Sequence, residues 1–147
     1  MSQRIRTSYI DGKWLPQSSR VVVRENPGSI DRVATRYCAA SAGQAREAMD
    51  AAEKAFSDWA ETPLFDRMDV LNRSLDALER DSERIAKLIT KENGKTLNDS
   101  RAEIVAALGD ARHHLADARR VLKIRNRRLS KGLTTALRRE SVGVYVL

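Results

Sequence analysis

Cysteine is nearly absent from this sequence, since Cys38 is the only one among 147 residues. A single thiol cannot form an internal disulfide, and structural zinc sites use about four Cys or His ligands. The sequence therefore excludes a small secreted scaffold held by disulfides and argues against a zinc finger. Aromatic residues are also scarce, at 5%, whereas alanine is the most frequent apolar residue. Alanine-rich helices must either approach one another closely or lie against another element.

Long hydrophobic runs are missing as well. Residues 1–14 contain no apolar stretch of the about 7 to 15 residues that a signal peptide needs. No other segment approaches the roughly 18 apolar residues of a membrane-spanning helix. We therefore predict a cytoplasmic protein that does not enter a membrane. The length suits one domain or part of one.

Acidic residues are absent from one long stretch, although the chain carries 27 Lys+Arg against 20 Asp+Glu and a net charge of +7. Nine basic residues and no acid lie between Arg119 and Arg139. Such a cluster could neutralise phosphates and bind nucleic acid with a strong salt dependence. It contains no aromatic residue for base stacking, however, so an interface arm or a solvated linker is favoured.

Residues 1–40 are predicted to form short strands and a hairpin. Asp11-Gly12 lies between β-formers, which is typical of a type I′ hairpin turn. Val21 to Val23 forms a second apolar run, and the turn sequence Asn26-Pro27-Gly28 follows it. A third run, Val33 to Ala39, precedes the first helix, so we expect one hairpin and two further short edge strands in this region.

Residues 41–121 are predicted to form four amphipathic helices, because their apolar residues recur at helical spacing. Ser41 and Gln44 have the spacing of a capping box, in which each satisfies an amide of the other. Thr62-Pro63 is expected to end the first helix and open the second, with Thr62 able to cap the second and Pro63 as its first residue. Asp81 is expected to start the third helix and Thr96 the fourth. Gly94 is expected to end the third helix in the left-handed conformation.

Residues 122–139 form the basic segment, in which Thr134 to Leu137 has β character. Residues 140–147 end on a nearly continuous apolar run from Val142 to Leu147. Such a run is expected of a strand that is buried on both faces. The sequence itself offers this strand no visible partner.

Candidate catalytic groups are few. Cys38 has no neighbouring His and is interpreted as a structural thiol. His113 and His114 are adjacent on a helix and point about 100° apart, so they cannot chelate one metal ion together. No phosphate-binding glycine motif, nucleophile elbow or H-E-x-x-H zinc motif occurs. From the residues alone we assign no catalytic, cofactor-binding or metal-ligating side chain.

Several motifs in their order nonetheless resemble the amino-terminal region of the aldehyde dehydrogenase superfamily. They are Y-I-D-G-K-W at 9–14, N-P at 26–27, A-R-E-A-M-D-A-A-E-K-A-F-S-D-W at 45–59, T-P with Arg67 at 62–67, K-E-N-G-K at 91–95 and E-S-V-G-V at 140–144. Ser141 departs from the pattern, since the family commonly has Pro there. The combination is specific, although no single motif is decisive.

The resemblance implies an α/β fold in which this chain is mostly α-helical, with about four helices, short N-terminal hairpin strands and a C-terminal strand. It would form an incomplete cofactor-binding domain. Residues 1–40 would supply strands, 41–121 the outer helical layer, 122–139 an arm that pairs across subunits, and 140–147 the first strand of a Rossmann-like sheet.

The implied activity is oxidation of an aldehyde to a carboxylic acid with NAD or NADP as cofactor. The family's catalytic Cys, general-base Glu and cofactor motifs follow the E-x-V-G-V strand, so we expect an amino-terminal fragment or truncated reading frame that is inactive alone. We expect such a chain to bind no cofactor by itself. Its partners would be an aldehyde, a second copy or the rest of the enzyme.

Two weaker implications concern particular residues. Ala106 and Asp110 lie on the fourth helix, which borders the aldehyde entrance in the family. The backbone carbonyl of Glu92 resembles one that helps to hold a monovalent cation. Two other functions remain open at this stage, namely a stand-alone helical interaction or oligomerisation module and a basic nucleic-acid-binding protein.

Overall fold

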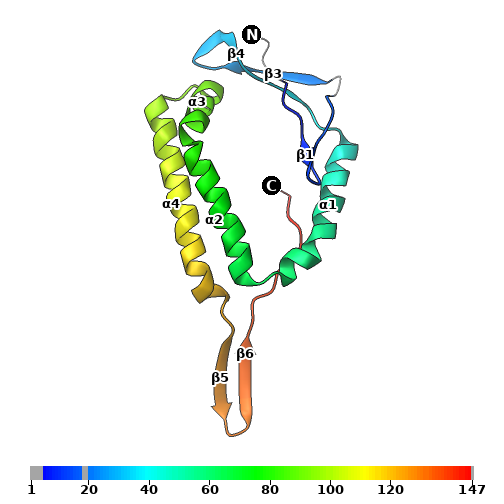
Figure 1. Cartoon of the computed structure of the whole chain (residues 1–147), viewed down its shortest axis with the longest axis vertical. Coiled ribbons are helices and arrows are strands. Elements are labelled where there is room, and N and C mark those ends of the chain that lie inside the picture. The colour runs from blue at the N-terminus through cyan, green and yellow to red at the C-terminus, as the bar shows by residue number, and fades with distance from the viewer. Residues whose placement is uncertain (1–4, 18–19, 147) are drawn as a thin grey trace.

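Four helices and three antiparallel strand pairs make up residues 5–17 and 20–146, which the computed structural model describes (Figure 1). The predictions for residues 1–4, 18–19 and 147 fall outside the described part. In chain order the elements are β1 (Tyr9–Ile10), β2 (Lys13–Trp14), β3 (Val21–Asn26), β4 (Ser29–Cys38), α1 (Ala42–Glu61), α2 (Leu64–Arg80), α3 (Ser82–Asn93), α4 (Leu97–Leu122), β5 (Arg125–Ser130) and β6 (Leu133–Leu137).

The N-terminal strands form two antiparallel pairs, of which the first is the predicted hairpin. In the turn between β1 and β2, Asp11 has φ 48° and Gly12 has φ 74°, the two positive angles of a type I′ turn. Between β3 and β4, the side-chain carbonyl of Asn26 accepts a hydrogen bond from Gly28 N at 2.9 Å. This bond closes the turn locally, which is the mechanism that makes Asn favourable there.

The start of α1 confirms the predicted capping box. Gln44 N donates to Ser41 Oγ at 3.1 Å, and Ser41 N donates to Gln44 Oε1 at 2.9 Å. Thr62 ends α1, as predicted, and its hydroxyl donates to Asp58 O at 2.7 Å. The prediction that Thr62 also caps α2 was wrong. Pro63 correspondingly precedes α2, which has no side-chain cap.

The third and fourth helices begin and end where the sequence predicts. Gly94 follows α3 with φ 74°, as expected of a left-handed C-terminal cap. Thr96 caps α4 by accepting a hydrogen bond from Asp99 N at 3.1 Å. Asp81 precedes α3 but makes no capping hydrogen bond, because its carboxylate instead binds Arg84.

The helices are not gathered into one bundle. Helices α3 and α4 pack along each other, with α2 against both, and α3 also contacts β3 and β4. Helix α1 instead contacts β1, and Figure 1 shows it apart from α2.

The division of the chain into the segments 1–40, 41–121, 122–139 and 140–147 stays a prediction.

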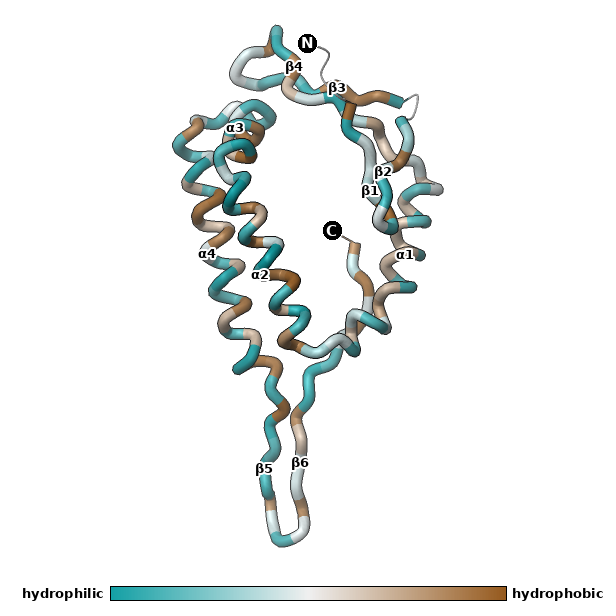
Figure 2. Tube along the Cα trace, in the orientation of Figure 1, coloured by the Kyte–Doolittle hydropathy of each residue, from teal (hydrophilic) through white to brown (hydrophobic). Residues whose placement is uncertain are grey.

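Few side chains in the described chain are buried. The buried ones are Ala34, Cys38, Ala86, Ser100 and Ile104. The accessible surface is 11886 Å², whereas a compact monomer of 16.5 kDa has about 7,600 Å². Figure 2 shows hydrophobic residues distributed along all four helices and at the end of the chain, and many of them are exposed. The apolar stripes predicted from the sequence therefore lack full cover within this chain.

The basic segment forms a hairpin of β5 and β6 that projects away from the helices (Figure 1). Every residue of both strands is exposed. The expected strand at 140–147 is not present over 140–146, because a strand is defined by hydrogen bonds to a neighbour and this segment pairs with none. None of the helices in the described residues is long and apolar enough to cross a membrane.

Candidate functional site

An apolar groove with a volume of about 460 Å³ lies between α2, α3 and α4. We call it the helix groove. Ile104 and Leu108 lie on the same face of α4, because residues four apart are one helical turn apart. Val105 stands at their side and is 71% exposed. The helix groove is lined by Glu79, Ser82, Glu83, Arg101, Ile104, Val105, Leu108, Gly109 and Arg112.

Two arginines of α4 hold the rims of the helix groove. Arg101 binds Glu83 with two parallel hydrogen bonds, Nε to Oε2 at 2.9 Å and Nη2 to Oε1 at 2.8 Å. Arg112 reaches Asp76 Oδ1 at 2.9 Å and Glu79 Oε2 at 2.7 Å. These contacts fix α4 against α3 and α2, and their partly exposed charges contribute little stability individually.

These contacts shift the acidity of the groups that they join. The hydrogen bond from Arg101 lowers the pKa of Glu83 from 4.5 to about 2, and Lys87 adds to this effect. Hydrogen bonds to Asp76 and Glu79 raise the pKa of Arg112. Glu83 and Arg112 therefore remain ionised at neutral pH, which suits a structural ion pair more than proton transfer.

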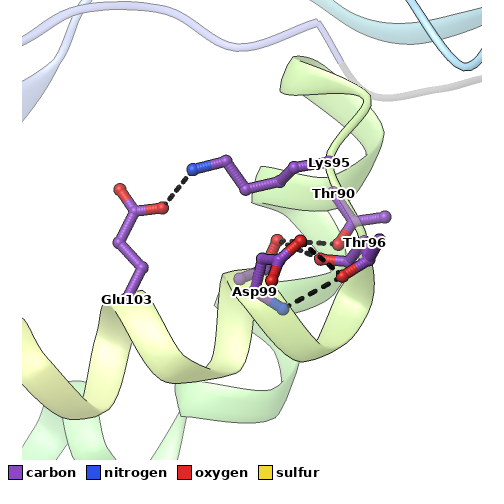
Figure 3. A network of polar contacts seen from close by, with 6 residues as sticks. Thr90, Lys95, Thr96, Asp99 and Glu103 are labelled. Atoms are coloured by element: carbon purple, nitrogen blue, oxygen red, sulfur yellow. Dashed lines mark hydrogen bonds and ion pairs between the residues drawn. The ribbon is translucent and has the colours of Figure 1, made fainter.

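A polar network joins the end of α3 to the start of α4 (Figure 3). Ser100 is fully buried, and its hydroxyl lies 2.8 Å from Thr90 Oγ1 and 3.1 Å from the backbone carbonyl of Thr96. On the solvent side, Lys95 forms an ion pair with Glu103. The buried hydroxyl is thus satisfied, and the network sets the angle between the two helices.

Gly94 brings together two motifs that lie far apart in the sequence. A Cβ added at Gly94 would lie 3.0 Å from Pro27 Cβ and 3.1 Å from Gly28 N. These distances are tighter than ordinary contact, so a Cβ would require the β3–β4 turn to shift by a few tenths of an ångström. The glycine also supplies the positive φ. The N-P and E-x-G-K motifs are therefore parts of one structural contact.

The residues predicted from the sequence lie apart from the helix groove. Ala106 and Asp110 are exposed on α4. At 100° per residue they lie on the helix face opposite Ile104 and Leu108. Glu92 is half-buried near the end of α3. The structure does not bring these three residues together.

The reactive side chains considered from the sequence also remain separate. Cys38 is buried in β4, which agrees with a structural thiol. His113 and His114 are exposed on α4, with ring centroids 5.9 Å apart. Over residues 5–17 and 20–146, the structure contains no cluster of three His, Cys, Asp or Glu that could hold a metal ion.

The starts of α1 and α4 do not fit a dinucleotide, and no glycine-rich turn precedes α2 or α3 in the described residues. Such a cofactor places its phosphates on free amides at a helix start, usually after a glycine-rich turn. Ser41 and Gln44 already satisfy amides at the start of α1, and Thr96 does so at the start of α4. We therefore derive no catalytic step through a nucleotide on this chain.

The sequence did not predict the helix groove or its clamps. Arg112 binds acids that lie 33 and 36 positions earlier in the chain. Local periodicity shows which face of a helix is apolar, but not which helix covers it. The spacing of Arg101, Ile104, Val105 and Leu108 was the one available signal, because it places charged and apolar residues on one side of α4.

The fold and these sites define a helical scaffold with projecting hairpins, in which ion pairs and polar networks join the helices. Comparison with known proteins identifies the family of this scaffold, because the model of the aldehyde dehydrogenase family matches residues 14–147. The chain belongs to the aldehyde dehydrogenase family. This finding confirms the resemblance seen in the sequence motifs.

Relatives differ in their substrates and cofactors. An N-succinylglutamate 5-semialdehyde dehydrogenase from Chromohalobacter salexigens is 36% identical over 68% of this chain and 20% of its own length. A D-glyceraldehyde dehydrogenase (NADP(+)) from Picrophilus torridus is 27% identical over 72% of this chain and 22% of its own length. A solved 1-pyrroline-5-carboxylate dehydrogenase from Thermus with bound NAD has a TM-score of 0.75 and 25% identity, and covers 80% of this chain and 23% of that one. The chain thus spans about a fifth to a quarter of these relatives.

Proposed function

We propose that this chain serves as the helical scaffold of an NAD(P)-dependent enzyme that oxidises an aldehyde to a carboxylic acid, and that it has no turnover alone. The observation that carries the proposal is the uncovered surface of a fold that matches family structures. An area of 11886 Å² exceeds that of a compact monomer by about 4,300 Å². Many large hydrophobic side chains are exposed on this surface, and exposed apolar patches of this kind mark faces that pack against other protein.

In this proposal α2, α3 and α4 pack on a sheet that further polypeptide supplies, and residues 140–147 add a strand to it. The apolar run from Val142 supports this role, since Val142, Tyr145 and Val146 are 81%, 74% and 75% exposed. A strand with hydrophobic residues on both faces belongs inside a parallel sheet. The missing strand pairing at 140–146 is then a consequence of the missing neighbour.

A segment exchange tests this proposal. The matching segment of the Picrophilus torridus D-glyceraldehyde dehydrogenase is replaced by residues 14–147 of this chain, and NADP reduction with D-glyceraldehyde is followed at 340 nm. We expect the exchanged enzyme to turn over, whereas the purified 147-residue chain does not. The same enzyme with the segment deleted is the matched control. Turnover by the isolated chain that survives Cys38→Ala would contradict the proposal.

Within the same enzyme, we propose that Ala106 and Asp110 border the aldehyde entrance. Their exposed position on α4, away from the packed face, supports this assignment. In the exchanged enzyme, Ala106→Phe should raise KM for a bulky aldehyde more than for D-glyceraldehyde. Equal effects on both aldehydes would contradict the assignment.

The backbone carbonyl of Glu92 stays a candidate ligand for a monovalent cation. Comparison of thermal stability in K⁺ and in Na⁺ tests this proposal, because a specific site should make the stability differ between the two ions.

The uncovered area also favours a second candidate, a stand-alone module that associates with itself. A stable dimer buries about 800 Å² on each partner, which the exposed faces could supply several times over. The exposed β5–β6 hairpin is the element proposed to pair between copies. Sedimentation velocity on the purified chain separates the two functions, since a stand-alone module forms a defined, cooperative oligomer and the scaffold forms none.

A further inference from the structure

A second hollow lies at the corner where α1 ends, α2 begins and the chain returns from the β5–β6 hairpin. We call it the basic corner pocket. Its volume is about 720 Å³. Its lining is contributed by four separate segments of the chain, which meet only in the fold. It is lined by Phe56, Ala60, Glu61, Thr62, Arg67, Leu122, Ile124, Arg138, Arg139, Glu140 and Ser141.

Arg67 in the first turn of α2 points to a missing partner. Its Nε is buried and has no hydrogen-bond acceptor among the described residues. Burying a guanidinium donor without an acceptor is costly, and buried polar atoms are satisfied in the large majority of cases. The geometry therefore calls for an acceptor that enters the pocket beside Arg67.

The other two arginines leave positive charge in the same pocket. Arg138 Nε lies 3.2 Å from Glu140 Oε1, so this pair is closed. Arg139 donates to the backbone carbonyl of Val121, which neutralises no charge. Within the described chain, neither Arg67 nor Arg139 has a carboxylate within ion-pair distance. The lining thus carries three arginines against Glu61 and Glu140, which leaves a net charge of +1 in the pocket.

The start of α2 adds positive partial charge to the basic corner pocket. Pro63 precedes the helix and offers no side-chain cap, so the first amides of α2 lack a side-chain acceptor. The positive end of the helix dipole therefore lies next to Arg67. A guanidinium group binds two oxygens of a carboxylate or a phosphate at once, so both groups are suitable ligands here.

We propose that the basic corner pocket binds a small oxyanion, a phosphate or carboxylate group, with Arg67 as its main ligand and Arg139 as the second. This inference does not depend on the proposed scaffold function, because all its residues belong to the described chain. The group sits at the junction of α1, α2 and the hairpin base. Its binding holds that junction in one geometry.

The test follows the Nε–H resonance of arginine by NMR while inorganic phosphate is added to the full chain, with acetate in a parallel titration. We expect a saturable shift of the Arg67 signal. Saturation by phosphate alone identifies a phosphate ligand, and saturation by acetate alone identifies a carboxylate ligand. Saturation by both shows that the pocket accepts either group. Linear shifts shared by all arginines would show non-specific screening and overturn the proposal.

Two variants on α2 make the test specific. Arg67→Gln should weaken phosphate binding at least about tenfold, because it removes a charge-assisted donor. Arg73→Gln is the matched control, since Arg73 lies on the same helix and pairs with Asp69 at 3.0 Å outside the pocket. Helical circular dichroism confirms that both variants fold. Equal affinity in Arg67→Gln and the unsubstituted chain would overturn the proposal.

Discussion

At the scale of single residues, Gly94 carries two constraints that can be separated. It has φ 74°, and a Cβ there would lie only 3.0 Å from Pro27 Cβ, whereas Gly12 has the same φ with open space around it. Left-handed backbone costs a non-glycine residue about 1–2 kcal/mol, and the steric contact adds to that cost at Gly94 alone.

We therefore expect Gly94→Ala to destabilise the α3–α4 junction by about 2 kcal/mol or more, which lowers amide protection there about thirtyfold. Hydrogen exchange at Ser100 and neighbouring amides measures the change. Gly12→Ala is the control and should leave those amides unaffected. Equal protection at the junction in Gly94→Ala would show that the β3–β4 turn does not pack there in solution.

The ion pair of Glu83 makes the stability of the fold depend on pH. The pKa of Glu83 in the fold is about 2, below the ordinary value of 4.5, because Arg101 donates to its carboxylate. A lowered pKa means that the unfolded chain binds the proton more readily. The stabilisation is therefore complete above pH 4.5 and is lost as the pH falls toward about 2.

A carbon-13 titration of the Glu83 carboxyl should give a midpoint near 2, and Arg101→Gln should move it toward 4.5. Glu83→Gln should flatten the loss of helical signal over that pH range. A midpoint that Arg101→Gln leaves in place would mean that the bidentate contact is absent in solution.

At the scale of elements, the β5–β6 hairpin bears on nucleic-acid binding. Arg125 and Arg127 alternate with Asn126 and Arg128 along β5, so the cations project from both faces of the two-stranded ribbon. A ribbon with divided charge cannot follow one phosphate backbone with all its cations.

We expect no measurable binding to random duplex DNA at about 0.15 M salt. Fluorescence anisotropy with a labelled duplex over a range of salt concentrations measures this. Contacts from all nine basic residues would give a slope of log K against log salt of about −8. A slope of that size would restore the nucleic-acid-binding function.

The elements also show how far the sequence could lead. Ser41 with Gln44, Asp11-Gly12 and Gly94 were predicted correctly, because each acts on backbone groups within three or four residues. Thr62 was predicted correctly to end α1 but wrongly to cap α2, since a hydroxyl between two helices can bond to either and local sequence does not decide. The strand at 140–147 could not form, because strand pairing depends on a neighbour that a local pattern does not contain.

At the scale of the whole molecule, the open arrangement predicts how the isolated chain unfolds. Only five described residues are buried, and most interhelix contacts lie among α2, α3 and α4. Cooperative melting needs a shared core, which the contact between α1 and β1 does not provide. The ion pairs of Arg101 and Arg112 join segments that are distant in the sequence. This is why they hold the helices together, and it is also why local sequence patterns could not predict them.

We expect a helical circular dichroism spectrum with a broad, weakly cooperative thermal transition, and a calorimetric enthalpy that differs from the van't Hoff value. Circular dichroism at 222 nm and differential scanning calorimetry measure the two quantities. A sharp two-state transition of a monomer would contradict the scaffold proposal, because it would require a core that this fold does not contain.

The β5–β6 hairpin has one more consequence, for the handling of the protein. Both outer edges of this ribbon present unsatisfied backbone groups, so each could template the addition of further strands and seed fibrils. Like charges on Arg125, Arg127, Arg128 and Lys131 keep approaching ribbons apart. Concentrated salt weakens that repulsion, so precipitation should begin at this ribbon in high-salt buffers.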